Sequence, residues 1–239
     1  MTLTIRQFTG GRTVWVVFAL GFLPAVFAAI YLLGNDTVSR LQYLNENILT
    51  TMYFPILLPI TTMILATAAI GNEIEDRTLP YLTLKPLSRF RIVVEKWLGS
   101  IWVAIPAILI GLLIACLVLF RGQSSDYQRV IVSALVSSAI GICAYCGIFL
   151  LISLVIQRAL LAGIIYTFVI ENILGRYMKG LRVVSIQYYV KSIYERMQDS
   201  PAAVSKNAAA LSTAIIVLVA ATVVSLLLAT WRLRRMSLD

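Results

Sequence analysis

Long runs of apolar residues constrain the fold of this chain more than any other feature. A helix that crosses the hydrocarbon core of a bilayer needs roughly 20 mostly apolar residues. Hydrophobic residues make up 60% of the chain and charged residues 13%, against roughly 45–50% and about 25% in a soluble domain. This composition excludes a disordered chain, a small disulfide scaffold and an ordinary cytosolic enzyme. It predicts an all-α integral membrane protein.

The apolar runs predict six transmembrane helices within a single domain, residues 1–239. The predicted spans cover about residues 13–33, 51–71, 97–120, 130–156, 159–175 and 208–230. Residues 34–50, between the first two spans, are expected to form a polar connection. The spans leave short loops and no room for a second soluble domain.

The segment 176–208 differs from the spans around it. Ile186, Val190, Ile193 and Met197 follow a spacing that places them on one face of a helix. We therefore expect an extracytoplasmic amphipathic helix before the last span, which lies at the membrane surface or folds partly back into it.

The charge balance is basic, with 20 Lys and Arg against 11 Asp and Glu, and the chain has no His. Most basic residues lie just outside the apolar runs, where they set orientation and contact anionic lipid headgroups rather than nucleic acid. The Lys and Arg of the short segments favour cytoplasmic termini. The sequence thus predicts a multi-pass protein of the cell membrane with both termini in the cytoplasm.

Signatures of catalysis are missing from the sequence. It contains no GxxxxGK[ST] phosphate loop, no GxSxG elbow and no HExxH zinc helix. The lack of His removes the commonest metal ligand and the usual general base. We expect no catalytic residue, no metal site and no cofactor in this chain.

Small residues recur along the fourth span. Ser133, Ser137, Gly141 and Gly147 have a spacing that lets helices approach closely in a membrane. The Cys143-Ala-Tyr-Cys146 sequence matches CxxC, but it lies inside an apolar run, as does Cys116. We interpret these cysteines as packing residues, which give no indication of an oxidising compartment.

Polar residues inside the second and fifth spans are candidates for a translocation path. They are Thr61, Thr62, Thr67, Tyr166, Thr167 and Glu171. A carboxylate at membrane depth is costly and points to a role, unless the span ends at Glu171 and places it at the interface. Threonine hydroxyls in membrane helices also hydrogen-bond their own backbone, so both interpretations stay open.

The segment 72–96 is the longest charged stretch between two spans. Its acidic start precedes apolar residues that include Leu79, Leu82 and Leu84, and then Pro86. This pattern predicts a short amphipathic helix near residues 76–84, which the proline ends, and a new helix start at Ser88. The apolar side chains need a surface to pack against, and a soluble partner beneath the membrane provides one.

The stretch GNEIEDRTLPYLTLKPLSRFRIVVEKWLGS (71–100) resembles the signature of type-2 ABC transporter permeases. That signature has an acidic residue, a Gly-Thr-Leu-like triplet, the pattern Leu-Leu-x-x-Pro-Leu-Ser-Arg, and a Lys that opens the next span. The matching residues are Glu73 or Glu75, Thr78-Leu79, Leu82-Thr83-Leu84, Pro86-Leu87-Ser88-Arg89 and Lys96. Arg77 stands where the family has Gly, which weakens the local turn.

The resemblance implies a permease of an ATP-driven exporter. It implies two ABC ATPase subunits that bind ATP and Mg²⁺, a second, identical permease copy, and a route between the copies lined by their second and fifth spans. The 72–96 segment would form the coupling helix, with a second contact at the turn 157–160. The coupling residues would be Glu73, Glu75, Thr78, Leu79, Leu82, Leu84, Pro86, Arg89 and Arg158.

Two other functions are compatible with the residues themselves. A membrane scaffold or assembly factor that transports nothing could use the same segment to recruit a soluble partner. A membrane-embedded enzyme acting on lipid would need acids such as Glu171 and Asp126, but no paired carboxylates occur at membrane depth.

Overall fold

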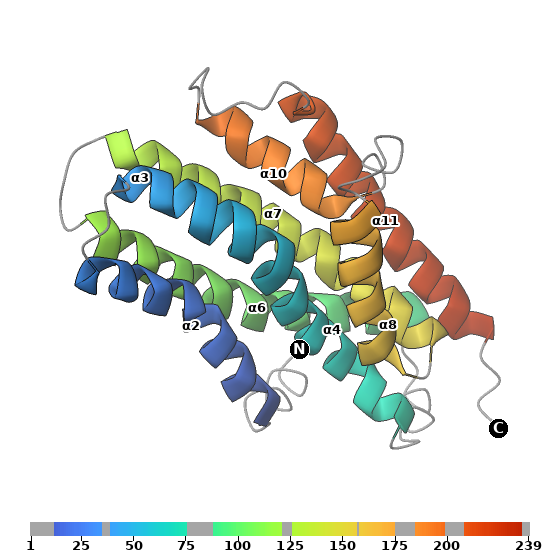
Figure 1. The fold of residues 1–239 in the computed structure, drawn as a ribbon. Helices are drawn as coiled ribbons and strands as arrows, with labels where there is room; N and C mark the ends of the chain where they lie inside the picture. Colours follow the sequence, from blue (N-terminus) through green and yellow to red (C-terminus); the bar gives the residue numbers. More distant parts are fainter. Residues whose placement is uncertain are drawn as a thin grey trace.

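A computed structural model describes residues 12–34, 39–75, 88–120, 126–156, 158–174, 185–198 and 208–235. Within these ranges every regular element is a helix (Figure 1). The α-helices are α2 (Arg12–Leu33), α3 (Arg40–Gln42), α4 (Leu58–Glu75), α6 (Arg89–Phe120), α7 (Asp126–Val155), α8 (Ala159–Ile165), α10 (Ile186–Met197) and α11 (Leu211–Arg235), and the π-helices are η1 (Tyr43–Leu57) and η2 (Tyr166–Leu174).

The predicted all-α membrane fold is confirmed. In the described part of the chain, five helices are long and apolar enough to cross a membrane. They cover Thr13–Leu33, Arg40–Ala69, Arg89–Phe120, Tyr127–Val155 and Leu211–Arg235. The predicted fifth span corresponds to a shorter apolar helix, Ala159–Asn172, so the count of six crossings stays a prediction.

The second long helix begins earlier than the sequence predicts. Residues 34–50 were expected to be a polar connection, and this is wrong from Arg40 onward, because α3, η1 and α4 follow one another without a break. Ser39 caps the start, and its Oγ accepts a hydrogen bond from the Gln42 N–H at 3.3 Å. Leu44, Ile48 and Leu49 are fully buried, so a buried apolar stripe holds this polar segment in a helix.

The amphipathic helix before the last span is confirmed as α10. The Ser185 hydroxyl caps its start by accepting a hydrogen bond from the Tyr188 N–H. Ile186, Val190 and Ile193 are buried, and α10 packs against α7, α11 and η1. The helix therefore packs into the bundle through its apolar face.

Helix α7 is the element around which the bundle is built, with contacts to α4, α6, α8, α10 and α11. Its small residues make these contacts close, which confirms their predicted packing role. A Cβ atom on Gly147 would lie 2.7 Å from the Ser225 hydroxyl of α11, and one on Gly141 would lie 2.9 Å from a Val190 methyl of α10. Ser133 and Ser137 are completely buried.

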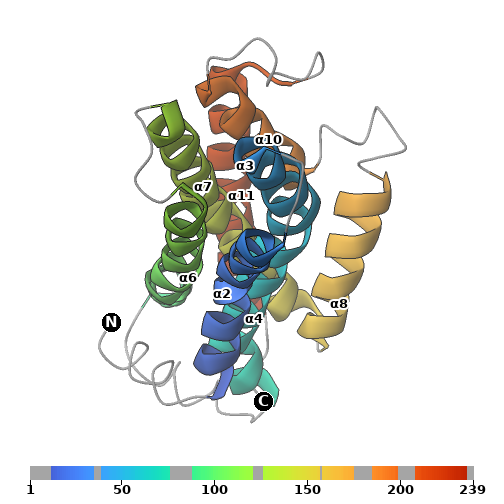
Figure 2. The same cartoon turned by 60° about the vertical axis from the view of Figure 1, so that its left-hand side comes forward.

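Helix α8 lies at the edge of the bundle (Figure 2), where it contacts α4 and α7. Its outer face carries exposed apolar side chains, which in a membrane would contact lipid or another protein. These side chains are Leu160, Leu161, Ile164 and Ile165.

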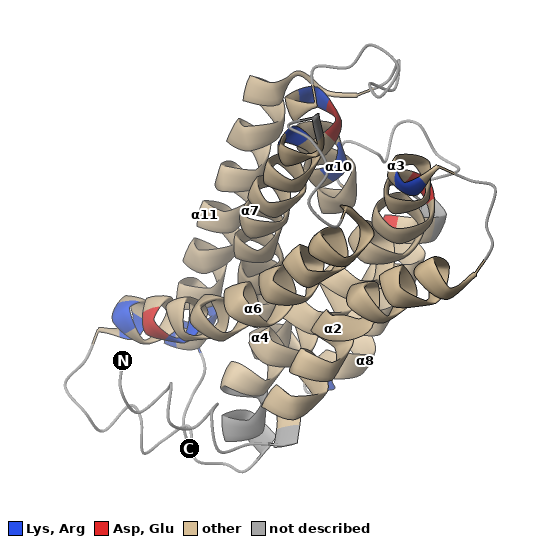
Figure 3. Ribbon diagram, turned by 90° about the vertical axis from the view of Figure 1, so that its left-hand side faces the viewer, with Lys and Arg blue, Asp and Glu red and all other residues tan. Residues whose placement is uncertain are grey.

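Charged residues gather at the two ends of the helices and leave the middle of the bundle largely free of them (Figure 3). One end holds the starts of α2, α6 and α8 and the ends of α4, α7 and α11 (Figure 1). The opposite end holds α3 and the C-terminal half of α10 (Figure 3). This separation is typical of a bundle that crosses a bilayer.

Candidate functional site

Four of the residues that the sequence assigns to partner coupling belong to described segments at one end of the bundle. Glu73 and Glu75 belong to the last turn of α4, Arg89 is the first residue of α6, and Arg158 is exposed between α7 and α8. The remaining coupling residues and the predicted 76–84 helix lie outside the described residues; they are Thr78, Leu79, Leu82, Leu84 and Pro86. Lys96 is buried along α6.

Arg89 also ties two helices together. Its Nη1 donates a hydrogen bond to the Leu233 carbonyl near the end of α11. Beneath this contact, Ile92 and Val93 of α6 pack with Leu226 and Leu233 of α11 in a small apolar cluster. The start of α6 is thereby fixed to the end of the last span.

The most developed polar arrangement inside the bundle surrounds Glu171 of η2. Its side chain is only 3% exposed. Oε1 accepts hydrogen bonds from the Tyr166 hydroxyl and the Ile186 N–H, both at 3.0 Å. Oε2 accepts from the Ser185 hydroxyl and, at 3.1 Å, from the Gln187 N–H. The carboxylate thus caps the start of α10, where unpaired N–H groups and the helix dipole favour a negative charge.

This cap lies at depth within the bundle. The Tyr145 side chain of α7 is close enough to Glu171 to interact electrostatically with it, although its hydroxyl completes no hydrogen bond in this structure. At a rise of 1.5 Å per residue, Tyr145 stands about 15 Å along α7 from Val155. Glu171 is thus buried inside the protein, and its depth in the membrane stays a prediction.

The candidate path threonines are all buried in the bundle. Thr61, Thr62 and Thr67 each donate a hydrogen bond to a carbonyl of their own helix, at 2.6–2.7 Å. Thr167 is completely buried, and its hydroxyl has no partner. The hydroxyls of α4 satisfy themselves within the helix, as membrane helices often do, and their place on a translocation path stays a prediction.

The two π-helices are joined near the same depth. The Asn172 side chain of η2 donates hydrogen bonds to the Pro55 carbonyl of η1 at 3.1 Å and to the Thr167 carbonyl at 3.0 Å. Glu171 and Asn172 are neighbours, so η2 holds α10 with one residue and η1 with the next. Sequence reasoning missed this pairing, because it joins residues far apart in the chain.

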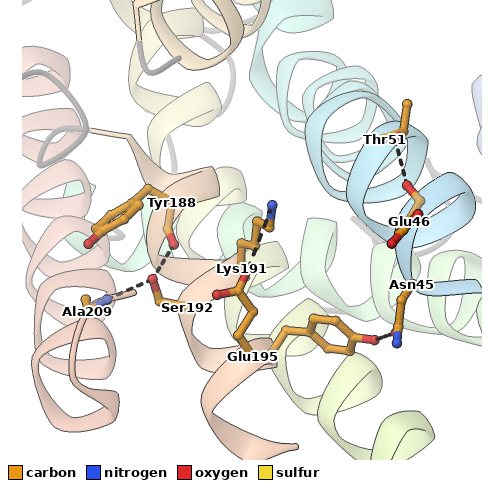
Figure 4. Close-up of polar contacts among 9 residues, drawn as sticks. Asn45, Glu46, Thr51, Tyr188, Lys191, Ser192, Glu195 and Ala209 are labelled. Atoms are coloured by element: carbon orange, nitrogen blue, oxygen red, sulfur yellow. Dashed lines mark hydrogen bonds and ion pairs between the residues drawn. The ribbon is translucent and has the colours of Figure 1, made fainter. Parts of the chain in front are cut away.

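A second polar group links η1 to α10 nearer the opposite end (Figure 4). The Tyr194 hydroxyl of α10 donates to Asn45 Oδ1 of η1. Burial raises the pKa of Tyr194, so the phenol keeps the proton that it donates. On α10 itself, Lys191 Nζ lies 3.8 Å from Glu195 Oε1, the weaker order of an i, i+4 pair.

Helix α10 is also fixed to the start of α11. The Ser192 hydroxyl donates to the Tyr188 carbonyl at 2.8 Å and accepts from the Ala209 N–H at 3.2 Å (Figure 4). The Arg196 guanidinium donates to the Ala208 and Ala209 carbonyls at 2.9 and 3.2 Å. These contacts and Glu171 hold α10 at both of its ends.

Among the described residues, no three His, Cys, Asp or Glu side chains come together in a way that could hold a metal ion. Cys116, Cys143 and Cys146 are free thiols.

Comparison with known families agrees with the all-helical membrane fold. The family model described as ABC-2 family transporter protein matches residues 5–238, nearly the whole chain. A comparison with curated proteins finds no match. Helical membrane architecture and the extent of the family match lead to one conclusion: the chain belongs to the ABC-2 transporter family and is a multi-pass membrane permease subunit of an ABC transporter.

Proposed function

We propose that this permease subunit serves an ATP-driven exporter of the cell membrane, with both termini in the cytoplasm. Two identical copies would associate with two ABC ATPase subunits, which bind ATP and Mg²⁺. The observation that carries this proposal is the common location of the α4 end, the α6 start and the α7–α8 turn at Arg158 (Figure 1). A soluble partner at this end could contact all three at once.

Glu171 supplies a route for movement from that end to α10. Helix α8 follows directly on the α7–α8 turn and continues into η2. Because η2 carries the carboxylate that caps α10, a displacement of α8 and η2 would carry the start of α10 with it. Alternating access relies on such movements between discrete packing arrangements.

The path for the cargo would lie between the two copies, beside the second helix and the α8–η2 segment. Glu171 contributes to this path by fixing its walls, since hydrogen bonds from the protein already occupy both carboxylate oxygens.

The coupling segment can be tested without knowledge of the cargo. The full chain carries an affinity tag, and ATPases that co-purify with it from its own cells are identified by mass spectrometry. Leu82→Asp/Leu84→Asp is compared with the apolar control Leu82→Met/Leu84→Met. We expect the Asp variant to remain folded and to lose the ATPase, because a charged side chain cannot pack in an apolar groove.

The control should retain the ATPase at the level of the parent chain. Retention of the ATPase by the Asp variant, with ATP hydrolysis responding to permease as before, would refute coupling through this segment. An ATPase that binds normally but never responds to any transported compound would favour the scaffold function.

A further inference from the structure

The cytoplasmic-side end of the bundle carries a compact group of cations from two helices. Arg89 and Arg91 lie in the first turn of α6, and Arg232, Arg234 and Arg235 lie in the last turn of α11. The hydrogen bond from Arg89 to the Leu233 carbonyl brings the two helix ends into contact. We call these five residues the arginine cluster; it belongs to the group of basic residues at this end in Figure 3.

Little negative charge from the described residues balances the arginine cluster. Glu95 pairs with Arg91 at 3.1 Å. Arg232, Arg234 and Arg235 form no ion pair with any carboxylate of the described ranges. The Nε of Arg232 is buried and has no hydrogen-bond partner, and an unsatisfied buried donor is costly. The cluster therefore has excess positive charge among the described residues.

The surroundings of the cluster indicate where this ligand comes from. Trp231 of α11 is 50% exposed and Leu227, one turn before it, is 55% exposed. On α6, Phe90 between the two arginines is 46% exposed. Arg235 lies over the Trp231 ring at 4.2 Å, and tryptophan is the residue of the headgroup region. The arginines thus border apolar side chains that lie ready to contact lipid tails.

We propose that the arginine-rich surface at the start of α6 and the end of α11 binds the phosphate of an anionic lipid. The guanidinium groups of the cluster suit a phosphate, because each can donate two hydrogen bonds to it. The acyl chains would run along Leu227 and the neighbouring face of α11. A zwitterionic lipid presents the same phosphate, but its own cation opposes the arginines, so the site prefers a headgroup with net negative charge.

Trp231 makes the site measurable in a bilayer. The chain has four tryptophans, so the full chain with Trp15→Phe, Trp97→Phe and Trp102→Phe keeps Trp231 as its single tryptophan. It is reconstituted with brominated phosphatidylglycerol diluted in unlabelled phosphatidylcholine, and with the labels exchanged. Fluorescence quenching then gives the relative affinity of the site near Trp231 for the two lipids.

We expect about a fivefold or greater preference for phosphatidylglycerol, since each Arg near a charged headgroup contributes on that order. Arg232→Gln/Arg234→Gln should bring the ratio close to one. Arg129→Gln removes an exposed cation at the opposite end of the bundle and should leave the ratio unchanged. If Arg232→Gln disturbs folding, Arg234→Gln/Arg235→Gln replaces exposed side chains only and should still reduce the preference at least twofold.

Equal quenching by both lipids in the parent chain would overturn the proposal, as would a preference that survives removal of the arginines. Equal quenching combined with loss of a co-purifying ATPase in Arg234→Gln/Arg235→Gln would assign the arginine cluster to a protein partner instead.

Discussion

Gly21 of α2 and Gly111 of α6 lie in direct backbone contact. A Cβ atom on Gly111 would overlap the Gly21 carbonyl, and one on Gly21 would lie 3.0 Å from the Ala107 carbonyl carbon. Both obstacles are main-chain atoms, which a rotamer change cannot move. Such close approach maximises the dispersion contacts that hold membrane helices together.

Gly111→Val should push α2 away from α6. We expect a loss of roughly 1–3 kcal/mol, the usual cost of overpacking, measured as lower resistance to thermal unfolding of the purified chain in detergent. Gly141→Val is the matched control, because its new Cβ meets first a Val190 methyl instead of a main-chain atom. Equal stability of Gly111→Val and the parent chain would contradict the contact.

Replacement of Glu171 should release the start of α10. Glu171→Ala removes the acceptor of two backbone N–H groups, and we expect a loss of roughly 1–3 kcal/mol, as for other unsatisfied buried donors. Hydrogen exchange at the Ile186 and Gln187 amides reports the change directly and should become faster.

Glu171→Gln separates the charge of this cap from its shape. The glutamine keeps one acceptor oxygen but turns an N–H₂ toward the N–H donors of α10, so we expect nearly the same loss of amide protection. Glu46→Gln, at an exposed carboxylate of η1, should leave the α10 amides unchanged. Protection at Ile186 that matches the parent chain in both Glu171 variants would rule out the cap.

The Tyr194–Asn45 hydrogen bond should couple η1 to α10 energetically. Tyr194→Phe and Asn45→Ala remove its donor and acceptor in turn. A double-mutant cycle by thermal unfolding should give a coupling energy of about 0.5–1.5 kcal/mol, the net contribution of a typical hydrogen bond. Fully additive effects would show that the two side chains do not interact.

Asn172 should hold the two π-helices together. Asn172→Asp removes the N–H₂ donor and directs a carboxylate at the Pro55 carbonyl, so we expect a destabilisation of roughly 1–3 kcal/mol. Asn45→Asp changes the same residue type at a position where the amide oxygen, not the nitrogen, is used, and it should cost less. The prediction fails if the order of the two variants in thermal unfolding is reversed.

The long helices α6, α7 and α11 could be predicted from the sequence, because their apolar runs are long enough to leave no alternative. The beginning of the second helix could not be placed from polarity alone. Asn45, Glu46 and Asn47 make that stretch polar, although Leu44 and Ile48 already have the spacing of a buried helix face. The cap at Ser185 has a signal in the sequence, because a serine before a periodic apolar segment indicates the start of a helix.

Contacts between distant parts of the chain had no such signal. Gly21 and Gly111 are single small residues within apolar runs, and no local sequence pattern indicates that they are in contact. The partners of Glu171 in α10 follow it by 14–16 residues, and only the packing of α10 into the bundle brings them to the carboxylate. A carboxylate within an apolar run is energetically costly in a membrane, and this cost indicated that Glu171 has a role. The role itself depends on the tertiary structure.

The capped start of α10 has a consequence for biogenesis. The ribosome delivers Glu171 before Ser185, Ile186 and Gln187 exist, so three of the four donors that its carboxylate has in the folded protein are made after it. The cap can therefore form only once the start of α10 has been synthesised, which makes it a late contact in the assembly of the bundle.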